Sequence, residues 1–171
     1  MLNRVYSKTR TEGHRAYPTP AMEIFLLDHA QRRAQRKELA LFRQLCDIFD
    51  WKLSRKQQRH YLKSLRLGST LVLTDLSKNI LWASHSFLSM TGYSANEVLG
   101  RKPGMLQGHE TDPQVVRHIR EQLNQAQPVK ADLTNYRKGG EPYQCRIAID
   151  PLWNSQGELT HFLAVECEVA A

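Results

Sequence analysis

G-R-K-P-G-M-L-Q-G-H-E-T-D-P, residues 100–113, decides the fold more than any other stretch of this chain. One helical pattern ends just before it, at Leu99, and another opens after Asp112. Its glycines and prolines favour an irregular connection over a regular element. The structural role of this stretch therefore has to be inferred from the elements that flank it.

Upstream of this stretch, the sequence predicts two strands and two short helices. Apolar runs at 71–75 and 80–84, joined by a short turn, indicate a β-hairpin. A short helix is expected at 87–93, and Ser94 with Glu97 fits a capping box that opens the next.

Downstream, Asp112 caps a longer helix, and three strands follow at 129–136, 143–151 and 159–169. The order β-β-α-α-α-β-β-β predicts an α+β fold, a five-stranded antiparallel sheet with helices on one face. Such a layered fold leaves a pocket between helices and sheet. Core or pocket residues expected there are Leu71, Leu73, Phe87, Leu106, Ile147, Ile149 and Phe162.

The N-terminal part differs in composition. Residues 1–68 carry 15 Lys and Arg against 6 Asp and Glu, whereas residues 69–171 carry 9 against 11. This change predicts two structural units with a boundary near Gly68. The predicted divisions are a flexible N-terminus at 1–16, an amphipathic helical extension at 17–67 and a domain at 68–171.

A long amphipathic helix is predicted to start at Thr19, a capping residue, and Pro20. Its apolar stripe needs a partner, either the sheet of the following domain or the same helix of a second copy. If the partner is a second copy, the residues expected to make the homodimer are Ile24, Leu27, Leu41, Leu45 and Ile48.

Ser54 can cap a second, shorter helix, which Gly68 would end. Its basic residues fit a solvated face, or alternatively a patch for nucleic acid or an acidic protein partner. A nucleic-acid contact would depend on salt and on these charges. The basic residues are Arg55, Lys56, Arg59, Lys63 and Arg66.

Other classes find little support. No apolar run approaches the roughly 20 residues that span a bilayer, and the N-terminus has no apolar signal core, so we expect a cytoplasmic protein. Three cysteines cannot all pair and show no metal-ligand spacing. Catalytic motifs, including those of a histidine kinase, are not found, so we expect no enzymatic activity.

Four blocks in this order resemble a PAS domain with its C-terminal PAC motif, over about residues 68–169. The resemblance implies a sensor of ligands, redox state or light that signals through its flanking helices to an unidentified partner. The blocks are F-L-S-M-T-G-Y-S-A-N-E-V-L-G, L-Q-G-H-E-T-D-P, N-Y-R-K-G-G-E-P-Y and H-F-L-A-V-E.

Residues 100–113 resemble the flavin-facing segment of the light-oxygen-voltage (LOV) subfamily, G-x-N-C-R-F-L-Q-G. The cysteine of that motif attacks the excited flavin, and Pro103 stands at its position. Proline has no nucleophile, so this resemblance implies a module without the subfamily's photochemistry.

The resemblance also assigns flavin-type positions. Gln107, Arg120 and Asn135 match a glutamine, a phosphate-binding arginine and a ring-edge asparagine of the subfamily. Five positions depart, so we expect no cofactor, with FMN or FAD as the alternative. Lys102 replaces an asparagine, Pro103 the cysteine, Gly104 an arginine, Cys145 an asparagine and Glu166 a glutamine.

Three hypotheses remain open. The first is a cofactor-free PAS sensory and interaction module, dimeric through its N-terminal helices, with space for a small apolar ligand. The second is a flavin-binding redox or light sensor without a cysteinyl adduct, and the third is a regulator that contacts nucleic acid. Haem would need an axial ligand, but the helical period turns His118 toward solvent.

Overall fold

The computed structural model describes residues 20–170. The chain divides into two compact units, residues 1–33 and 34–171. In the first unit the described part is the N-terminal half of α1 (Pro20–Ile48). There Asp28 and Arg32 form an i,i+4 ion pair, 2.9 Å from Nε to Oδ2. The predicted flexible residues 1–16 and the predicted cap Thr19 lie outside the described residues.

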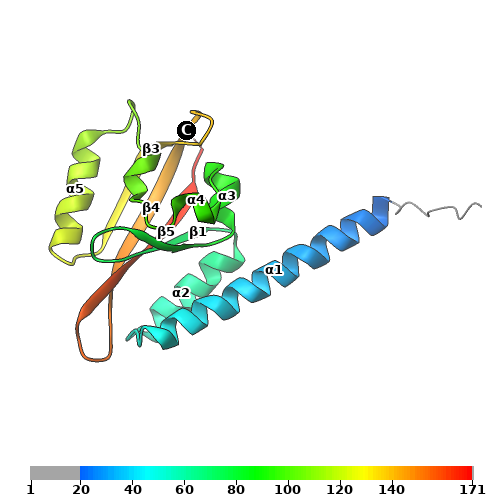
Figure 1. Cartoon of the computed structure of the whole chain (residues 1–171), viewed down its shortest axis with the longest axis horizontal. Helices are drawn as coiled ribbons and strands as arrows, with labels where there is room; N and C mark the ends of the chain where they lie inside the picture. Colours follow the sequence, from blue (N-terminus) through cyan, green and yellow to red (C-terminus); the bar gives the residue numbers. More distant parts are fainter. Residues whose placement is uncertain (1–19, 171) are drawn as a thin grey trace, which may run out of the picture. The chain divides into compact units, whose positions relative to one another are not determined.

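The second unit is built on a five-stranded antiparallel sheet with the strand order β2-β1-β5-β4-β3 (Figure 1). The predicted fold class is therefore confirmed. The strands are β1 (Thr70–Thr74), β2 (Ile80–Ala83), β3 (Val129–Tyr136), β4 (Pro142–Trp153) and β5 (Leu159–Glu168). The helices are α2 (Arg55–Arg66), α3 (Ser86–Thr91), α4 (Ala95–Val98) and α5 (Pro113–Asn124), with a 3-10 helix, η1 (Pro103–Leu106).

The structure confirms the capping residues that the sequence predicted for three helices. Ser54 caps α2 in a capping box with Gln57, and Ser94 caps α4 in the same way. Asp112 caps α5 by accepting a hydrogen bond from the Gln114 N–H at 2.7 Å. The single turn η1 was not predicted.

One face of the sheet is covered by helices of the N-terminal extension. Leu71 and Leu73 point to this face and pack in one buried cluster with Phe42 of α1 and Tyr61 of α2. The Tyr61 hydroxyl donates a hydrogen bond of 2.7 Å to Asp150 Oδ2 of β4. Residues 34–67 thus share the compact unit of the sheet, although charge predicted a boundary at Gly68. The charges lie on the surface, and the apolar side chains bind the extension to the sheet.

The opposite face carries α3, α4, η1 and α5 over three further clusters. Val72 and Ala164 point to this face, one residue along each strand from Leu71 and Leu163 on the other. Strand alternation explains how β1 is buried on both sides. Phe87 and Leu106 anchor α3 and η1 here. The predicted "helices on one face" therefore describes only this side of the sheet.

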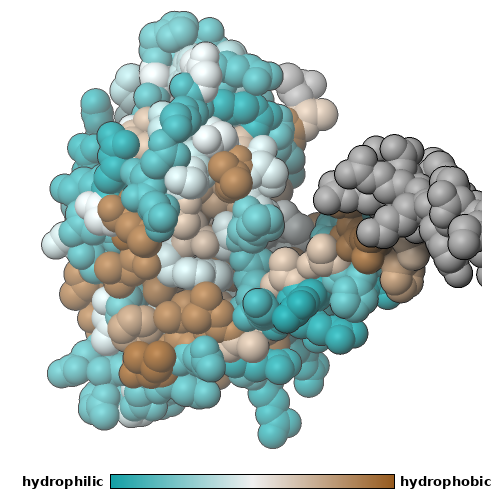
Figure 2. Space-filling view, turned by 45° about the vertical axis from the view of Figure 1, so that its right-hand side comes forward, coloured by the Kyte–Doolittle hydropathy of each residue, from teal (hydrophilic) through white to brown (hydrophobic). Residues whose placement is uncertain are grey.

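The surface retains scattered apolar residues. Leu76, Leu81 and Trp153 are each 40% exposed or more. On the face of the molecule that Figure 2 shows, hydrophobic residues lie in patches among hydrophilic ones. In the part of the chain that the structure describes, no helix is long and apolar enough to cross a membrane.

Candidate functional site

A cavity of about 500 Å³ lies between the sheet and the segment η1–α5. Its walls are mainly apolar, because inward-facing strand residues meet the apolar face of α5. The apolar lining residues are Val72, Leu76, Pro103, Leu106, Val116, Ile119, Leu123, Leu133, Ile147, Ile149, Phe162 and Ala164.

The 100–113 segment forms one wall of this cavity and is attached to the sheet at both of its ends. At its start it bonds the edge strand β2: the Gly100 N–H donates to the Ile80 carbonyl at 2.8 Å, and the Ile80 N–H donates to the Arg101 carbonyl at 2.9 Å. Leu106, 2% exposed, anchors η1 from within.

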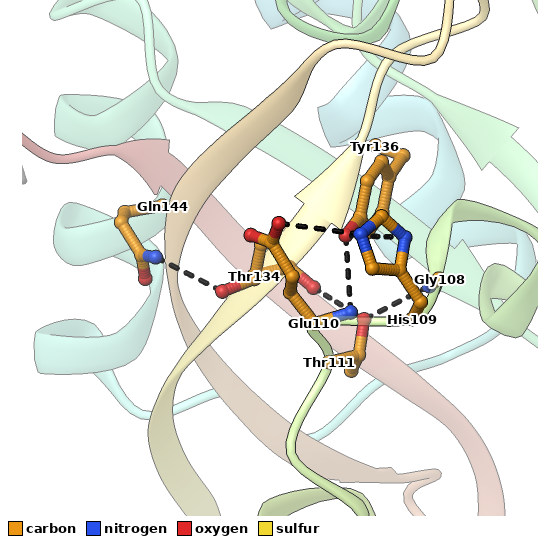
Figure 3. Close-up of polar contacts among 7 residues, drawn as sticks. All are labelled: Gly108, His109, Glu110, Thr111, Thr134, Tyr136 and Gln144. Atoms are coloured by element: carbon orange, nitrogen blue, oxygen red, sulfur yellow. Dashed lines mark hydrogen bonds and ion pairs between the residues drawn. The ribbon is translucent and has the colours of Figure 1, made fainter.

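Beyond η1, the loop packs against Tyr136 of the other edge strand, β3 (Figure 3). The Tyr136 hydroxyl accepts a hydrogen bond of 3.0 Å from the Glu110 N–H and lies 3.1 Å from His109 Nδ1. The Tyr136 ring fills the space where Gly108 would carry a side chain. Only glycine therefore permits this close approach.

A second set of bonds ties the loop to the β3 backbone. The Thr111 hydroxyl donates to the Thr134 carbonyl at 2.6 Å and accepts from the Gly108 N–H at 2.9 Å (Figure 3). On the same strand, Thr134 Oγ1 accepts from Gln144 Nε2 of β4 at 2.9 Å. The loop thereby satisfies an edge carbonyl of the sheet and holds the cavity wall in place.

The structure brings the three flavin-type positions together: Gln107, Arg120 and Asn135 all line the cavity. Their environments differ. Asn135 is 6% exposed on the inner face of β3, whereas Gln107 and Arg120 are exposed at the rim. Only Asn135 therefore offers its amide in surroundings where a hydrogen bond is worth most.

Four of the five departures line the same cavity, namely Lys102, Pro103, Gly104 and Glu166. The fifth, Cys145, is fully buried and is not among the lining residues. Burial raises the pKa of its thiol well above the usual range, and Glu166 adds to the increase. Cys145 is thus an inert core residue rather than a nucleophile.

Glu166 is the most unusual group in the cavity wall. It is 7% exposed on β5, and its Oε2 atom has no hydrogen-bond partner in the protein. Burial raises the pKa of this carboxyl from 4.5 to about 7. A buried carboxyl without a partner favours its neutral form, which can donate a hydrogen bond to a bound molecule.

Sequence reasoning missed two features. Lys78, in the β1–β2 turn, lines the cavity, because the hairpin folds it over Phe162. A smaller pocket of about 340 Å³ also adjoins the cavity, and the two share Gln107, Val116 and Arg120. The turn signal at 77–79 marked the hairpin but not the direction of the lysine side chain.

The five residues predicted to make a homodimer all lie on α1 and differ in exposure. Ile24, Leu27 and Ile48 are 68%, 70% and 72% exposed. Leu41 is 39% exposed, and Leu45 is partly buried against the cluster that contains Phe42, Tyr61, Leu71 and Leu73.

Two further predicted surfaces can be located. All five basic side chains of α2 are exposed, as a solvated face requires. His118 is also exposed, as its helical position predicted, and does not line the cavity. Among residues 20–170, no cluster of His, Cys, Asp and Glu could hold a metal ion.

The comparisons with known proteins agree with this geometry. A model of the PAS domain family matches residues 68–167. The blue-light-activated histidine kinase of Brucella canis is 42% identical over 90 residues, which are 53% of this chain and 18% of the kinase. This chain thus spans less than a fifth of that relative's length.

Solved LOV domains are also similar. One, from a study of a flavin analogue, is 36% identical with a TM-score of 0.60, and the match covers 65% of this chain and 85% of that one. The LOV domain of a blue-light-activated histidine kinase from Erythrobacter litoralis is 26% identical with a TM-score of 0.57. That match covers 60% of this chain and 97% of the other.

Proposed function

We propose that this chain, which belongs to the PAS domain family, is a sensory module of signal transduction that responds to a non-covalently bound small molecule. One observation carries the proposal: a cavity of about 500 Å³ has an unpartnered buried carboxyl in its wall and no cysteine among its lining residues, all of which the structure describes. Such a cavity can bind a ligand but offers no thiol for an adduct.

The signal would leave through the sheet and the helices on its outer face. β5 carries Glu166 on the cavity side and Leu163 on the other, where Leu163 packs with Phe42 and Tyr61. A ligand that shifts β5 therefore acts directly on the packing of α1 and α2. No catalytic step is required, and a protein partner would read the helices.

A homodimer is part of this proposal. Leu27, Leu41 and Ile48 recur on α1 at multiples of seven residues, and all three are exposed. A seven-residue apolar repeat favours pairing with another helix of the same kind. The second copy of α1 is therefore the partner that this stripe fits best.

Binding of the neutral dye N-phenyl-1-naphthylamine tests the cavity. We expect its fluorescence to rise with the wild-type protein, and Ala164→Leu, which narrows the cavity from β5, to weaken binding by about tenfold or more. A leucine at Ala148, which faces away on β4, is the matched control. Dye binding that Ala164→Leu leaves unchanged would remove the support for a ligand cavity.

A second candidate is a flavin-binding redox or light sensor without a cysteinyl adduct. It is favoured because Gln107, Arg120 and Asn135 line one cavity with the unpartnered Oε2 of Glu166. These groups fit a planar ring with a polar edge: Asn135 and Glu166 would bind that edge, and Arg120 would bind a phosphate. A bound flavin would supply electron-transfer chemistry, and the protein would orient it and keep water away.

Addition of FMN followed by desalting tests this candidate. A retained flavin spectrum that is lost in Asn135→Leu would support it, because that variant removes the buried amide from the cavity wall. A protein that stays colourless would exclude it and leave the first proposal standing.

A further inference from the structure

Three cationic side chains from three separate segments line the cavity. Lys78 comes from the β1–β2 turn, Lys102 from the residue before η1, and Arg120 from α5. The single acidic residue of the lining is Glu166, which is buried and favours its neutral form. Glu166 lies in the buried wall on β5, so the rim itself carries three positive charges and no carboxylate of its own.

Lys78 is held over the cavity wall rather than extended into solvent. Its ammonium lies 4.1 Å from the centroid of the Phe162 ring and donates a hydrogen bond of 2.9 Å to the Leu76 carbonyl. The residue has a φ of 68°, a conformation in which glycine or asparagine is more usual. The turn thus accepts an uncommon backbone conformation at the residue whose side chain covers Phe162.

Asp75 attracts this lysine, but its carboxylate is already hydrogen-bonded within the turn. Asp75 is bound by Asn79, whose N–H and side-chain amide donate to its two carboxylate oxygens at 2.7 and 2.8 Å. In the described part of the chain, neither Lys78 nor Lys102 forms an ion pair. Burial lowers the pKa of Lys78; Asp75 opposes that change, and the charge of Lys102 adds to it. Lys102 therefore repels Lys78 by less than Asp75 attracts it, and an anion between the two lysines would remove that repulsion.

We propose that Lys78 and Lys102 form an anion-binding rim, so that the cavity selects a small amphiphilic anion with an apolar or aromatic body and a terminal acidic group. The body contacts the apolar walls, such as Ile149 and Phe162, and the acidic group lies between the two lysines. A bound anion would accept charge-assisted hydrogen bonds, which are stronger than neutral ones. This inference rests on the proposed ligand-binding function and names the class of ligand.

Two dyes that differ by one sulfonate separate the two claims. They are 8-anilinonaphthalene-1-sulfonate and the neutral N-phenyl-1-naphthylamine, titrated into the full chain and followed by fluorescence. We expect the sulfonate dye to bind about tenfold more tightly, and this advantage to shrink as salt increases. The dyes should displace each other, because they share the cavity.

The double variant Lys78→Gln with Lys102→Gln should abolish the advantage of the sulfonate dye and change the affinity of the neutral dye by less than about twofold. Lys56→Gln with Lys130→Gln is the matched control, because both lysines are exposed, lie outside the cavity and remove the same charge. Circular dichroism checks that each variant is folded.

Each outcome then has one meaning. Loss of the charge preference in the rim variant alone supports the anion-binding rim. Equal affinities for the two dyes, or a preference that the rim variant keeps, would overturn the rim but not the cavity. A neutral dye that does not bind in the cavity would overturn the proposed function itself. Displacement by FMN or by decanoate distinguishes a phosphate-bearing ring from an aliphatic acid.

Discussion

The ring of Tyr136 lies so close to Gly108 that a Cβ on residue 108 would come within 2.4 Å of the ring atom Cε2. Real Cβ atoms do not approach a ring carbon so closely. The two residues belong to the loop that walls the cavity and to the edge strand β3. The contact therefore fixes the distance between the loop and the sheet.

Gly108→Ala should destabilise the protein by about 1–3 kcal/mol, because either the loop or the tyrosine ring must move. Urea unfolding measures the change. In a double-mutant cycle with Tyr136→Ala, most of that cost should disappear, since the ring is then absent. Additive effects of the two substitutions would contradict the contact.

Glu166 gives the protein a specific pH dependence. Its pKa of about 7 in the folded state lies above the ordinary value of 4.5, so the folded state binds more protons than the unfolded state between these values. Stability should therefore fall as pH rises from about 4.5 to about 7, by up to about 3 kcal/mol from this group.

Glu166→Gln provides the comparison, because its amide does not titrate. The free energy of unfolding of the variant should rise relative to wild type between about pH 5 and pH 7, and the difference should then level off. Burial raises the pKa of neighbouring Tyr143 and Cys145 well above this range, so neither contributes. A difference that is constant with pH would mean that Glu166 ionises normally.

Leu41→Glu should dissociate the proposed dimer, because a charge in the apolar stripe of α1 must be desolvated when the helices pair. Ala40→Glu adds the same charge to the neighbouring exposed residue and should leave the dimer intact. Light scattering coupled to size exclusion gives the masses. A wild-type monomer, or a dimer that tolerates Leu41→Glu, would contradict helix pairing.

Deletion of residues 1–50 would also remove the proposed dimer helix α1, but it would not test helix pairing alone. The deletion would remove Phe42 as well, which is 1% exposed within the cluster that holds Leu71 and Leu73.

Tyr61→Phe should cost about 1–2 kcal/mol of stability, because Asp150 loses the hydroxyl that donates to its carboxylate. Tyr93→Phe is the control, since the structure gives the hydroxyl of this half-buried tyrosine no such bond. Thermal or urea unfolding compares them. Equal effects of the two substitutions would mean that the Tyr61–Asp150 bond does not hold α2 on the sheet.

Local signals explain how much of the fold was predictable. Capping residues such as Ser54 and Asp112 act on their own helix, and strand alternation acts within a few residues, so sequence alone indicated them. The packing of α1 and α2 on the sheet depends on contacts of Phe42 and Tyr61 with Leu71 and Leu73. Composition does not predict such contacts between distant residues.

The residues of the candidate site likewise include some that the sequence predicted and some that it did not. The motif resemblance indicated Gln107, Arg120 and Asn135, and the structure places them around one cavity. Lys78 could not be found in this way, because its side chain reaches the cavity only through the direction of the β1–β2 turn. Gly108 was part of the quoted motif, but its reason, the ring of Tyr136, lies 28 residues further along the chain.

The most direct test of a sensor without a cysteinyl adduct is a visible absorption spectrum under blue light. Purified protein is incubated with excess FMN, desalted and measured in the dark, during illumination and after return to darkness, without added reductant. We predict that any retained flavin forms no cysteinyl adduct under illumination, because no thiol lines the cavity. Bleaching of bound flavin that recovers in the dark, and that is lost when Cys46, Cys145 and Cys167 are replaced by alanine, would contradict this prediction.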